Sequence, residues 1–168
     1  MSQFNRREFI KAFAAASSAT ALSFPSIARA GAKARVIVIG GGFGGATAAK
    51  YIKMGDAGID VTLIEPNKTY TSCPLSNEVL VGDRDIKSLQ VGYDGLKKRG
   101  VNVLHDTVTK VDPAKKTVTT QGGKTLAYDA LVMSPGIEFN YAGVEGYTEA
   151  LAEGDLPHAY KAGAQTLT

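Results

Sequence analysis

The run Arg35–Ile39, followed at once by six residues of which five are glycine, constrains the fold of this 168-residue chain more than any other segment. An unbroken run of β-branched residues is typical of a parallel strand that is buried on both faces. Ala46–Lys53 then predicts a helix, and Val61–Glu65 predicts a second strand that Pro66 ends. A strand–helix–strand unit of about thirty residues is a βαβ element. It predicts an α/β fold with a parallel sheet.

The glycine turn satisfies the pattern G-x-G-x-x-G at Gly40, Gly42 and Gly45. The first glycine permits the tight turn out of the strand, the second leaves room for a pyrophosphate, and the third lets the helix lie close to the strand. Phe43 and Gly44 stand in the same turn, just before the helix start, where free amides and the helix dipole favour an anion. Because this turn follows a strand and opens a helix, we interpret it as a dinucleotide-binding turn and not as a merely tight one.

Glu65 stands at the end of the second strand, with Pro66 directly after it. A carboxylate at this place accepts hydrogen bonds from ribose hydroxyls and disfavours a 2′-phosphate. These residues do not choose between NAD and FAD, because both cofactors contain an ADP-ribosyl group. The choice depends on features elsewhere in the chain.

Residues 1–30 predict a secretory signal peptide of the twin-arginine type. They combine the Arg6-Arg7 pair, an Ala- and Ser-rich apolar run over Ala12–Phe24, and an A-x-A cleavage pattern at Ala28–Ala30. The apolar run is too short and too weakly hydrophobic for a stable membrane span. We expect export to the periplasm, which favours a tightly held flavin over a free nicotinamide cofactor. The alternative is an amphipathic N-terminal helix of the mature fold.

The formal net charge of +3 originates in the signal segment, and residues 31–168 are neutral overall. Nothing in that balance favours nucleic acid or an anionic membrane surface as a partner. Cys73 is the only cysteine, so the chain holds no intrachain disulfide, zinc knuckle or c-type haem motif, and we expect no metal site.

Further elements are expected outside the strand–helix–strand unit. Residues 67–83 are expected to form a loop that contains Cys73, Ser88–Arg99 a weak helix, and Val101–Leu104 a third strand. From Ile137 the chain is expected to be loop-like until a helix begins near Pro157.

Three short alternating runs predict an antiparallel meander, namely Val108–Asp112, Thr117–Thr120 and Thr125–Tyr128. Ala130–Met133 is then expected to be a fourth buried strand, ending in Ser134-Pro135-Gly136. This strand and turn resemble the second fingerprint of flavoprotein reductases, in which the turn approaches the flavin-binding region. The resemblance favours FAD, and Ser134, Pro135, Gly136 and Val108 join the candidate site.

From Arg6 to Thr168 the chain resembles the N-terminal part of the flavoprotein subunit of flavocytochrome c sulfide dehydrogenases. The blocks that carry the resemblance are Val38–Gly42, Gly45–Lys53, Val61–Asn67, Leu75–Val79, Gly92–Leu96, Val132 with Pro135–Glu138, and Leu156–Ala159. The later blocks make it specific, because the first is shared by many flavoproteins.

The resemblance implies that FAD is bound covalently, by a thioether between its 8α-methyl carbon and Cys73. From the residue alone, Cys73 is expected to be a small, buried hydrophobic side chain. The family oxidises sulfide or related sulfur compounds and passes electrons through the flavin to a c-type cytochrome subunit. The resemblance therefore implies that this chain forms a heterodimer with such a cytochrome subunit.

The redox cystine of the family has no counterpart in this sequence, so we assign no catalytic residue here, and neither His105 nor His158 is given an acid–base role. The predicted fold is a Rossmann-like FAD-binding domain over residues 31–168, with a parallel sheet and a meander insertion. We expect it to be incomplete at its C-terminal end, as in a fragment of a longer protein. The alternatives are a relative of the sulfide:quinone reductases or NADH dehydrogenases, and a non-catalytic FAD-binding fragment.

Overall fold

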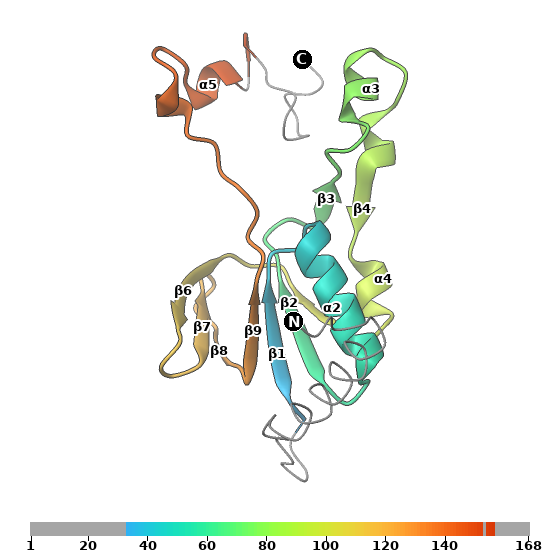
Figure 1. Cartoon of the computed structure of the whole chain (residues 1–168), viewed down its shortest axis with the longest axis vertical. Helices are drawn as coiled ribbons and strands as arrows, with labels where there is room; N and C mark the ends of the chain where they lie inside the picture. The colour runs from blue at the N-terminus through green and yellow to red at the C-terminus, as the bar shows by residue number, and fades with distance from the viewer. Residues whose placement is uncertain (1–32, 153, 157–168) are drawn as a thin grey trace, which may run out of the picture. The chain divides into compact units, whose positions relative to one another are not determined.

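A computed structural model describes residues 33–152 and 154–156. Strand β1 (Arg35–Ile39) is one of the two inner strands of a four-stranded parallel sheet and lies between β2 (Asp60–Ile64) and β9 (Ala130–Met133). β5 (Asn102–Leu104) pairs with the other side of β2, which gives the order β5-β2-β1-β9 (Figure 1). Numbered along the parallel strands alone, this is the order 3-2-1-4 of a Rossmann-like sheet. The predicted fold class is confirmed.

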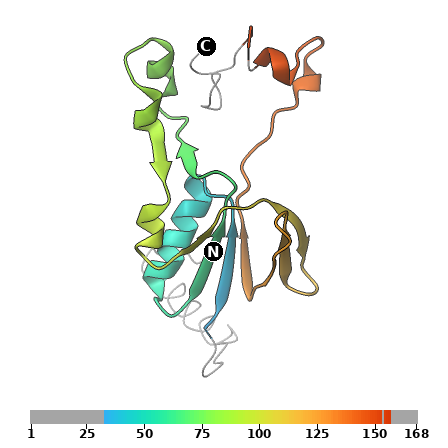
Figure 2. The same cartoon turned by 180° about the vertical axis from the view of Figure 1, so that it is seen from behind.

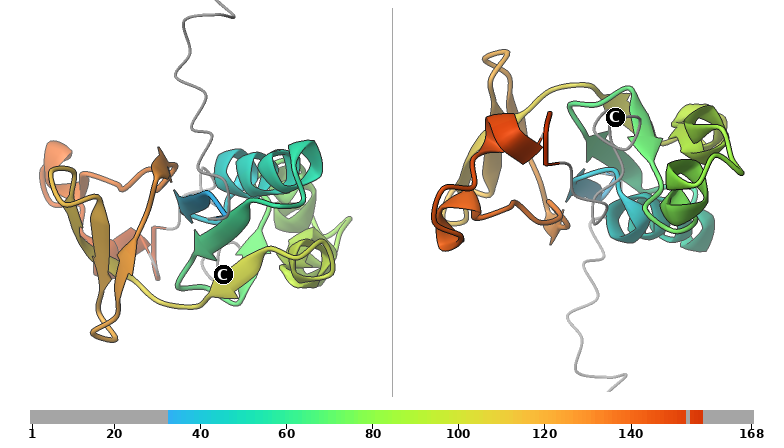
Figure 3. Two further views of the ribbon diagram at one scale, coloured as in Figure 1. Left: turned by 90° about the horizontal axis from the view of Figure 1, so that it is seen from below. Right: turned by 90° about the horizontal axis from the view of Figure 1, so that it is seen from above.

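Both faces of the sheet are covered, which explains the unbroken apolar run of β1. Val36 and Val38 pack in a core with helix α2 (Phe43–Gly55), and Ile37 and Ile39 pack in a second core with the meander (Figures 2 and 3). Val38 is fully buried and Ile37 is 2% exposed. The interpretation of this run as a strand buried on two faces is therefore confirmed.

The meander consists of β6 (Val108–Asp112), β7 (Thr117–Thr120) and β8 (Thr125–Ala127), paired antiparallel in that order. It lies in the sequence between the third and fourth parallel strands, as predicted. The fully buried side chain of Val118 belongs to the core that the meander shares with the sheet. Tyr128, predicted as the last residue of β8, lies beyond the strand and buries its ring in the same core.

Helix α2 begins at Phe43, three residues before the predicted start at Ala46. The reason is that Gly42 already accepts the first helical hydrogen bond, from the Ala46 amide at 2.9 Å. The glycine turn therefore passes directly into the helix, with no connecting residues between them. This places the first turn of the helix against the end of β1.

The predicted helix over Ser88–Arg99 is wrong. The chain forms a 3-10 helix η1 (Ile86–Leu89), a strand β4 (Gln90–Gly92) and a short helix α4 (Asp94–Lys97). Val and Gly at the centre of this segment are poor helix formers. The residues Gln90–Gly92 pair instead with β3 (Thr69–Thr71), a contact between distant segments that local periodicity does not reveal.

The predicted loop over residues 67–83 is also corrected, because it contains β3 and the short helix α3 (Ser76–Leu80). A short ion pair of 2.7 Å between Arg84 and Glu78 closes the turn after α3. The segment after Ile137, expected to be loop-like, contains a 3-10 turn η2 (Tyr141–Gly143) and a short helix α5 (Glu149–Ala152). Such single turns have too little periodicity to be predicted.

The predicted signal peptide over residues 1–30, the predicted helix after Pro157 and His158 lie outside the described residues. The described residues belong to a unit that spans Lys33–Thr168. No helix among residues 33–152 and 154–156 has the length and apolar character needed to cross a membrane.

Candidate functional site

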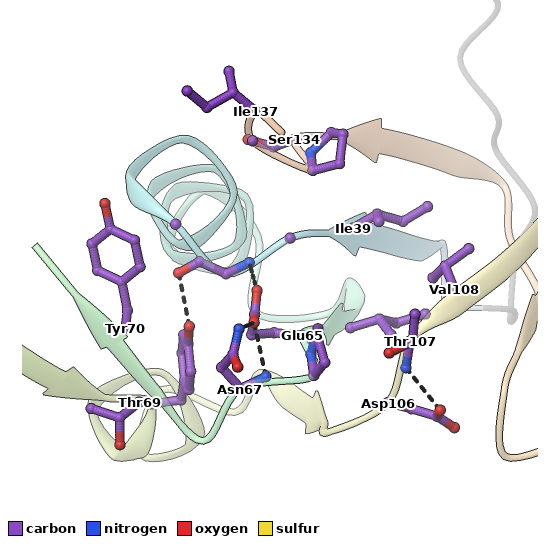
Figure 4. A pocket seen from close by; sticks show the side chains of 18 of the residues that line it. Ile39, Glu65, Asn67, Thr69, Tyr70, Asp106, Thr107, Val108, Ser134 and Ile137 are labelled. Atoms are coloured by element: carbon purple, nitrogen blue, oxygen red, sulfur yellow. Dashed lines mark hydrogen bonds between the residues drawn. The ribbon is translucent and has the colours of Figure 1, made fainter. Parts of the chain in front are cut away.

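A cavity of about 900 Å³ lies where the parallel strands end. Its walls come from the glycine turn after β1, from the residues after β2, β5 and β9, and from the region of β3 (Figure 4). In open α/β sheets the carboxyl ends of the strands are where ligands bind. The volume lies at the upper end of the range of about 300–1,000 Å³ that is usual for small-molecule sites.

Two glycines of the turn are required by the packing of the protein itself. Gly40 has φ +93°, and a Cβ atom there would lie 2.0 Å from the carbonyl oxygen of Ser134. A Cβ atom on Gly45 would lie 1.8 Å from the carbonyl oxygen of Gly40. Glycine at these two positions therefore allows the turn after β1 to approach the turn after β9 and the first turn of α2 closely.

Gly42 differs, because nothing in the protein requires it to be a glycine. Its φ of −68° and ψ of −169° are ordinary extended values. A Cβ atom there would have Tyr70 Cε2, at 3.5 Å, as its nearest neighbour, which is a normal van der Waals distance. Gly42 lines the cavity, so its missing side chain leaves space in the cavity and not in the core.

The N-terminus of α2 offers unpaired positive charge at the same place. The first N–H groups of a helix have no partner within the helix. Within the described part of the chain, no side chain caps this terminus and the first turn contains no acidic residue. A helix of thirteen residues with an uncapped N-terminus attracts an anionic group through its amides and its dipole.

Glu65 is 9% exposed and its carboxylate joins the glycine turn to the segment after β2. The Gly41 amide donates to Oε2 at 2.7 Å, while the main-chain N–H and side-chain Nδ2 of Asn67 both donate to Oε1 at 2.9 Å (Figure 4). A carboxylate has about four acceptor sites. One therefore remains for a hydroxyl group that enters the cavity.

Tyr93 reaches the same turn from the beginning of α4 and is only 5% exposed. Its hydroxyl donates to the carbonyl oxygen of Gly41 at 3.1 Å. Burial, the negative charge of Glu65 and the neighbouring Tyr70 raise the pKa of Tyr93 to about 12, so the hydroxyl keeps its proton at neutral pH. The sequence did not single out this residue, because Tyr93 lies within the segment predicted as a weak helix. A buried tyrosine usually hydrogen-bonds its hydroxyl, but the burial of Tyr93 follows from distant contacts.

Cys73 and Tyr70 form another wall of the cavity. Cys73 is exposed, contrary to the burial expected from the residue alone. Burial, and then the charge of Cys73, raise the pKa of Tyr70. The ring of Phe43 meets that of Tyr70 edge-to-face, with 5.3 Å between centroids.

The turn after β9 and the start of the meander complete the cavity. The Ser134 amide donates to the carbonyl oxygen of Ile39 at 2.8 Å, which ties this turn to the end of β1. Asp106 lies opposite, where a hydrogen bond from the Thr120 side chain, followed by amides of Thr107 and Gly122, lowers the pKa of its carboxyl. Val108 lines the cavity beside them (Figure 4).

Nine of the twelve predicted site residues line this one cavity: Gly40, Gly42, Glu65, Pro66, Cys73, Val108, Ser134, Pro135 and Gly136. Phe43, Gly44 and Gly45 do not line it but form the first turn of α2. His105 has Nδ1 3.2 Å from the carbonyl oxygen of Glu65, a contact to the main chain. Among the described residues, no group of three His, Cys, Asp or Glu side chains could hold a metal ion.

Residues 34–165 match the family model described as pyridine nucleotide-disulphide oxidoreductase. The chain belongs to this family of FAD-dependent oxidoreductases. The match covers the parallel sheet, the glycine turn and the meander, which together form the FAD-binding fold of the family.

Three named proteins are similar to parts of this chain. It is 56% identical over 45 residues to the flavoprotein chain of sulfide dehydrogenase (flavocytochrome c) from Chlorobaculum thiosulfatiphilum, which covers 27% of this chain and 94% of that sequence. It is 34% identical to apoptosis-inducing factor homolog A of Dictyostelium discoideum, over 67% of this chain and 26% of the relative. The solved sulfide:quinone oxidoreductase of Aquifex aeolicus matches with a TM-score of 0.62 and 31% identity, over 66% of this chain and 26% of that one. The chain thus spans about a quarter of the length of the last two.

Proposed function

We propose that this chain binds FAD, with the diphosphate at the N-terminus of α2 and the adenine-side ribose at Glu65. The observation that carries the proposal is Gly42, whose missing side chain no internal contact explains and which borders the uncapped helix terminus. Glu65 lies in the same cavity with an acceptor site to spare for a ribose hydroxyl. The donor set therefore fits the anionic and hydroxyl groups of the ADP half of FAD.

We further propose that the thiol of Cys73 holds the flavin covalently. The cavity that contains the glycine turn also contains Cys73 and the turn Ser134–Gly136. The proposal rests on this shared cavity, on the exposure of the cysteine and on the resemblance to the sulfide dehydrogenase flavoproteins. A thioether would keep the cofactor on the protein after export.

Replacing Cys73 with serine is expected to abolish covalent flavin while leaving non-covalent FAD binding. The full-length protein would be denatured in acid, and flavin absorbance measured on the precipitate and in the supernatant. We expect the flavin on the precipitate in the wild-type protein and in the Ser72→Ala control, and in the supernatant for Cys73→Ser. Release of all flavin from the wild-type protein would contradict covalent attachment but not FAD binding itself.

The substrate class proposed for the full-length protein is sulfide or a related small sulfur compound, with a c-type cytochrome subunit as electron acceptor in the periplasm. FAD, when bound, supplies the group that accepts electrons from the sulfur donor. The residues described above bind and orient it. The relative at 56% identity, named as a sulfide dehydrogenase flavoprotein chain, supports this choice.

The likeness to the Aquifex sulfide:quinone oxidoreductase favours a second candidate, in which a quinone takes the electrons. Adding sulfide without oxygen to the full-length protein is expected to bleach the flavin absorbance, and added cytochrome c is expected to restore it. Restoration by a quinone alone would favour the second candidate. Bleaching by NADH and not by sulfide would contradict both sulfur-based proposals.

A further inference from the structure

We infer that Tyr93 is a positioning residue that fixes the orientation of the peptide between Gly41 and Gly42 for diphosphate binding. This inference rests on the proposed function, because it concerns how the chain prepares its FAD site. Tyr93 lies outside the glycine motif and directly precedes α4, more than fifty residues along the chain.

Three consecutive glycines, Gly40 to Gly42, form a segment with unusual freedom of backbone rotation. A peptide in such a segment can turn over, and its carbonyl oxygen then takes the place of its N–H group. A carbonyl oxygen that faced the diphosphate would repel it, because both carry negative charge. The site therefore needs a device that holds this peptide in one orientation.

The structure contains such a device on both polar groups of Gly41. Its N–H group donates to Glu65 Oε2 at 2.7 Å, and its carbonyl oxygen accepts from the Tyr93 hydroxyl at 3.1 Å. Both contacts are buried. We call the pair of side chains, Glu65 and Tyr93, the Gly41 clamp.

The clamp acts on the next amide through the planarity of the peptide. The described residues contain no cis peptide bond, so the carbonyl of Gly41 and the N–H of Gly42 point in opposite directions. Since the carbonyl of Gly41 points toward the Tyr93 hydroxyl, the N–H of Gly42 is directed away from Tyr93. Gly42 lines the cavity, so this N–H is available to an anion there.

Tyr93 also explains why position 41 is a glycine. A Cβ atom on Gly41 would lie 2.5 Å from the Tyr93 hydroxyl oxygen and 2.8 Å from Glu65 Cγ. A side chain at position 41 would therefore displace the clamp from the turn. Because the tyrosine is buried and keeps its proton, the donor is present over the physiological pH range.

The test uses the full-length protein with Cys73→Ser, in which FAD binds reversibly. Adding Tyr93→Phe is expected to weaken FAD and ADP binding about tenfold, the usual worth of one lost hydrogen bond. Adenosine, which has no diphosphate, is expected to bind equally well to both proteins. Tyr128→Phe is the matched control, because it removes a hydroxyl from a tyrosine that is 7% exposed in the other core.

A second readout needs no ligand. In the FAD-free protein, Tyr93→Phe is expected to accelerate amide hydrogen exchange over residues 40–45 severalfold, and Tyr128→Phe is not. Equal FAD affinities in the Tyr93→Phe and Tyr128→Phe proteins would overturn the positioning role and leave the proposed function intact. The same conclusion would follow if Tyr93→Phe weakened adenosine binding as much as it weakened ADP binding. Failure of the Cys73→Ser protein to bind any FAD would overturn the proposed function instead.

Discussion

Replacing Gly45 with alanine is expected to lower the free energy of unfolding by at least about 3 kcal/mol, the upper range for overpacking a filled site. The added Cβ atom would lie 1.8 Å from the carbonyl oxygen of Gly40, which is main chain and cannot rotate away. The same atom would also lie 3.3 Å from Val38 Cγ1 in the core. Either α2 must move off the sheet or the turn must open. Urea unfolding followed by circular dichroism measures the change.

Gly55→Ala is the matched control for this prediction. Gly55 is the last residue of the same helix, and a Cβ atom there would meet nothing within 4 Å. Alanine is the better helix former, so this variant is expected to be as stable as the wild-type protein or slightly more stable. Equal stability of the Gly45→Ala and Gly55→Ala proteins would contradict the close packing of α2 against the turn.

Replacing Gly42 with threonine is expected to have the opposite consequence: a stable protein that binds FAD much more weakly. The backbone at this position suits any residue, and threonine is a good N-cap for α2. Its side chain, however, would occupy the space beside the helix terminus and would take one of the amides that an anion needs. In the Cys73→Ser protein we expect FAD affinity to fall about a hundredfold, equivalent to the combined cost of a clash and a lost charged hydrogen bond.

Isothermal titration with FAD, together with urea unfolding, tests this second prediction. The Cys73→Ser protein without the threonine is the control. If Gly42→Thr lost stability and FAD affinity together, the glycine would be structural, as Gly45 is. If the variant bound FAD as well as the control does, the diphosphate would not lie at this turn.

Much of the parallel sheet and of the meander could be predicted, because their signals are local. The apolar run of β1 and the turn residues around Val108–Asp112, Thr117–Thr120 and Ala130–Met133 defined elements whose bounds the structure repeats. The glycine pattern likewise indicated a site at the end of β1. These features depend on residues that are close in sequence, and so the pattern alone was sufficient.

The segment between β2 and β5 could not be predicted, because its structure depends on distant contacts. β4 exists only by pairing with β3, some twenty residues earlier, and Tyr93 is buried against a turn formed by Gly41. Local propensity favoured a weak helix over Ser88–Arg99. The role of Asn67, which holds Glu65 Oε1 with two donors, was equally invisible, because the block Val61–Asn67 indicates a resemblance and not a contact.

We propose that this chain carries FAD at the glycine turn and that it is exported to the periplasm. The most direct measurement is the flavin content of the full-length protein purified from the periplasm of its host, from its absorbance spectrum and the protein concentration. We expect FAD in an amount equimolar with the chain. A folded protein that contains no flavin would contradict it.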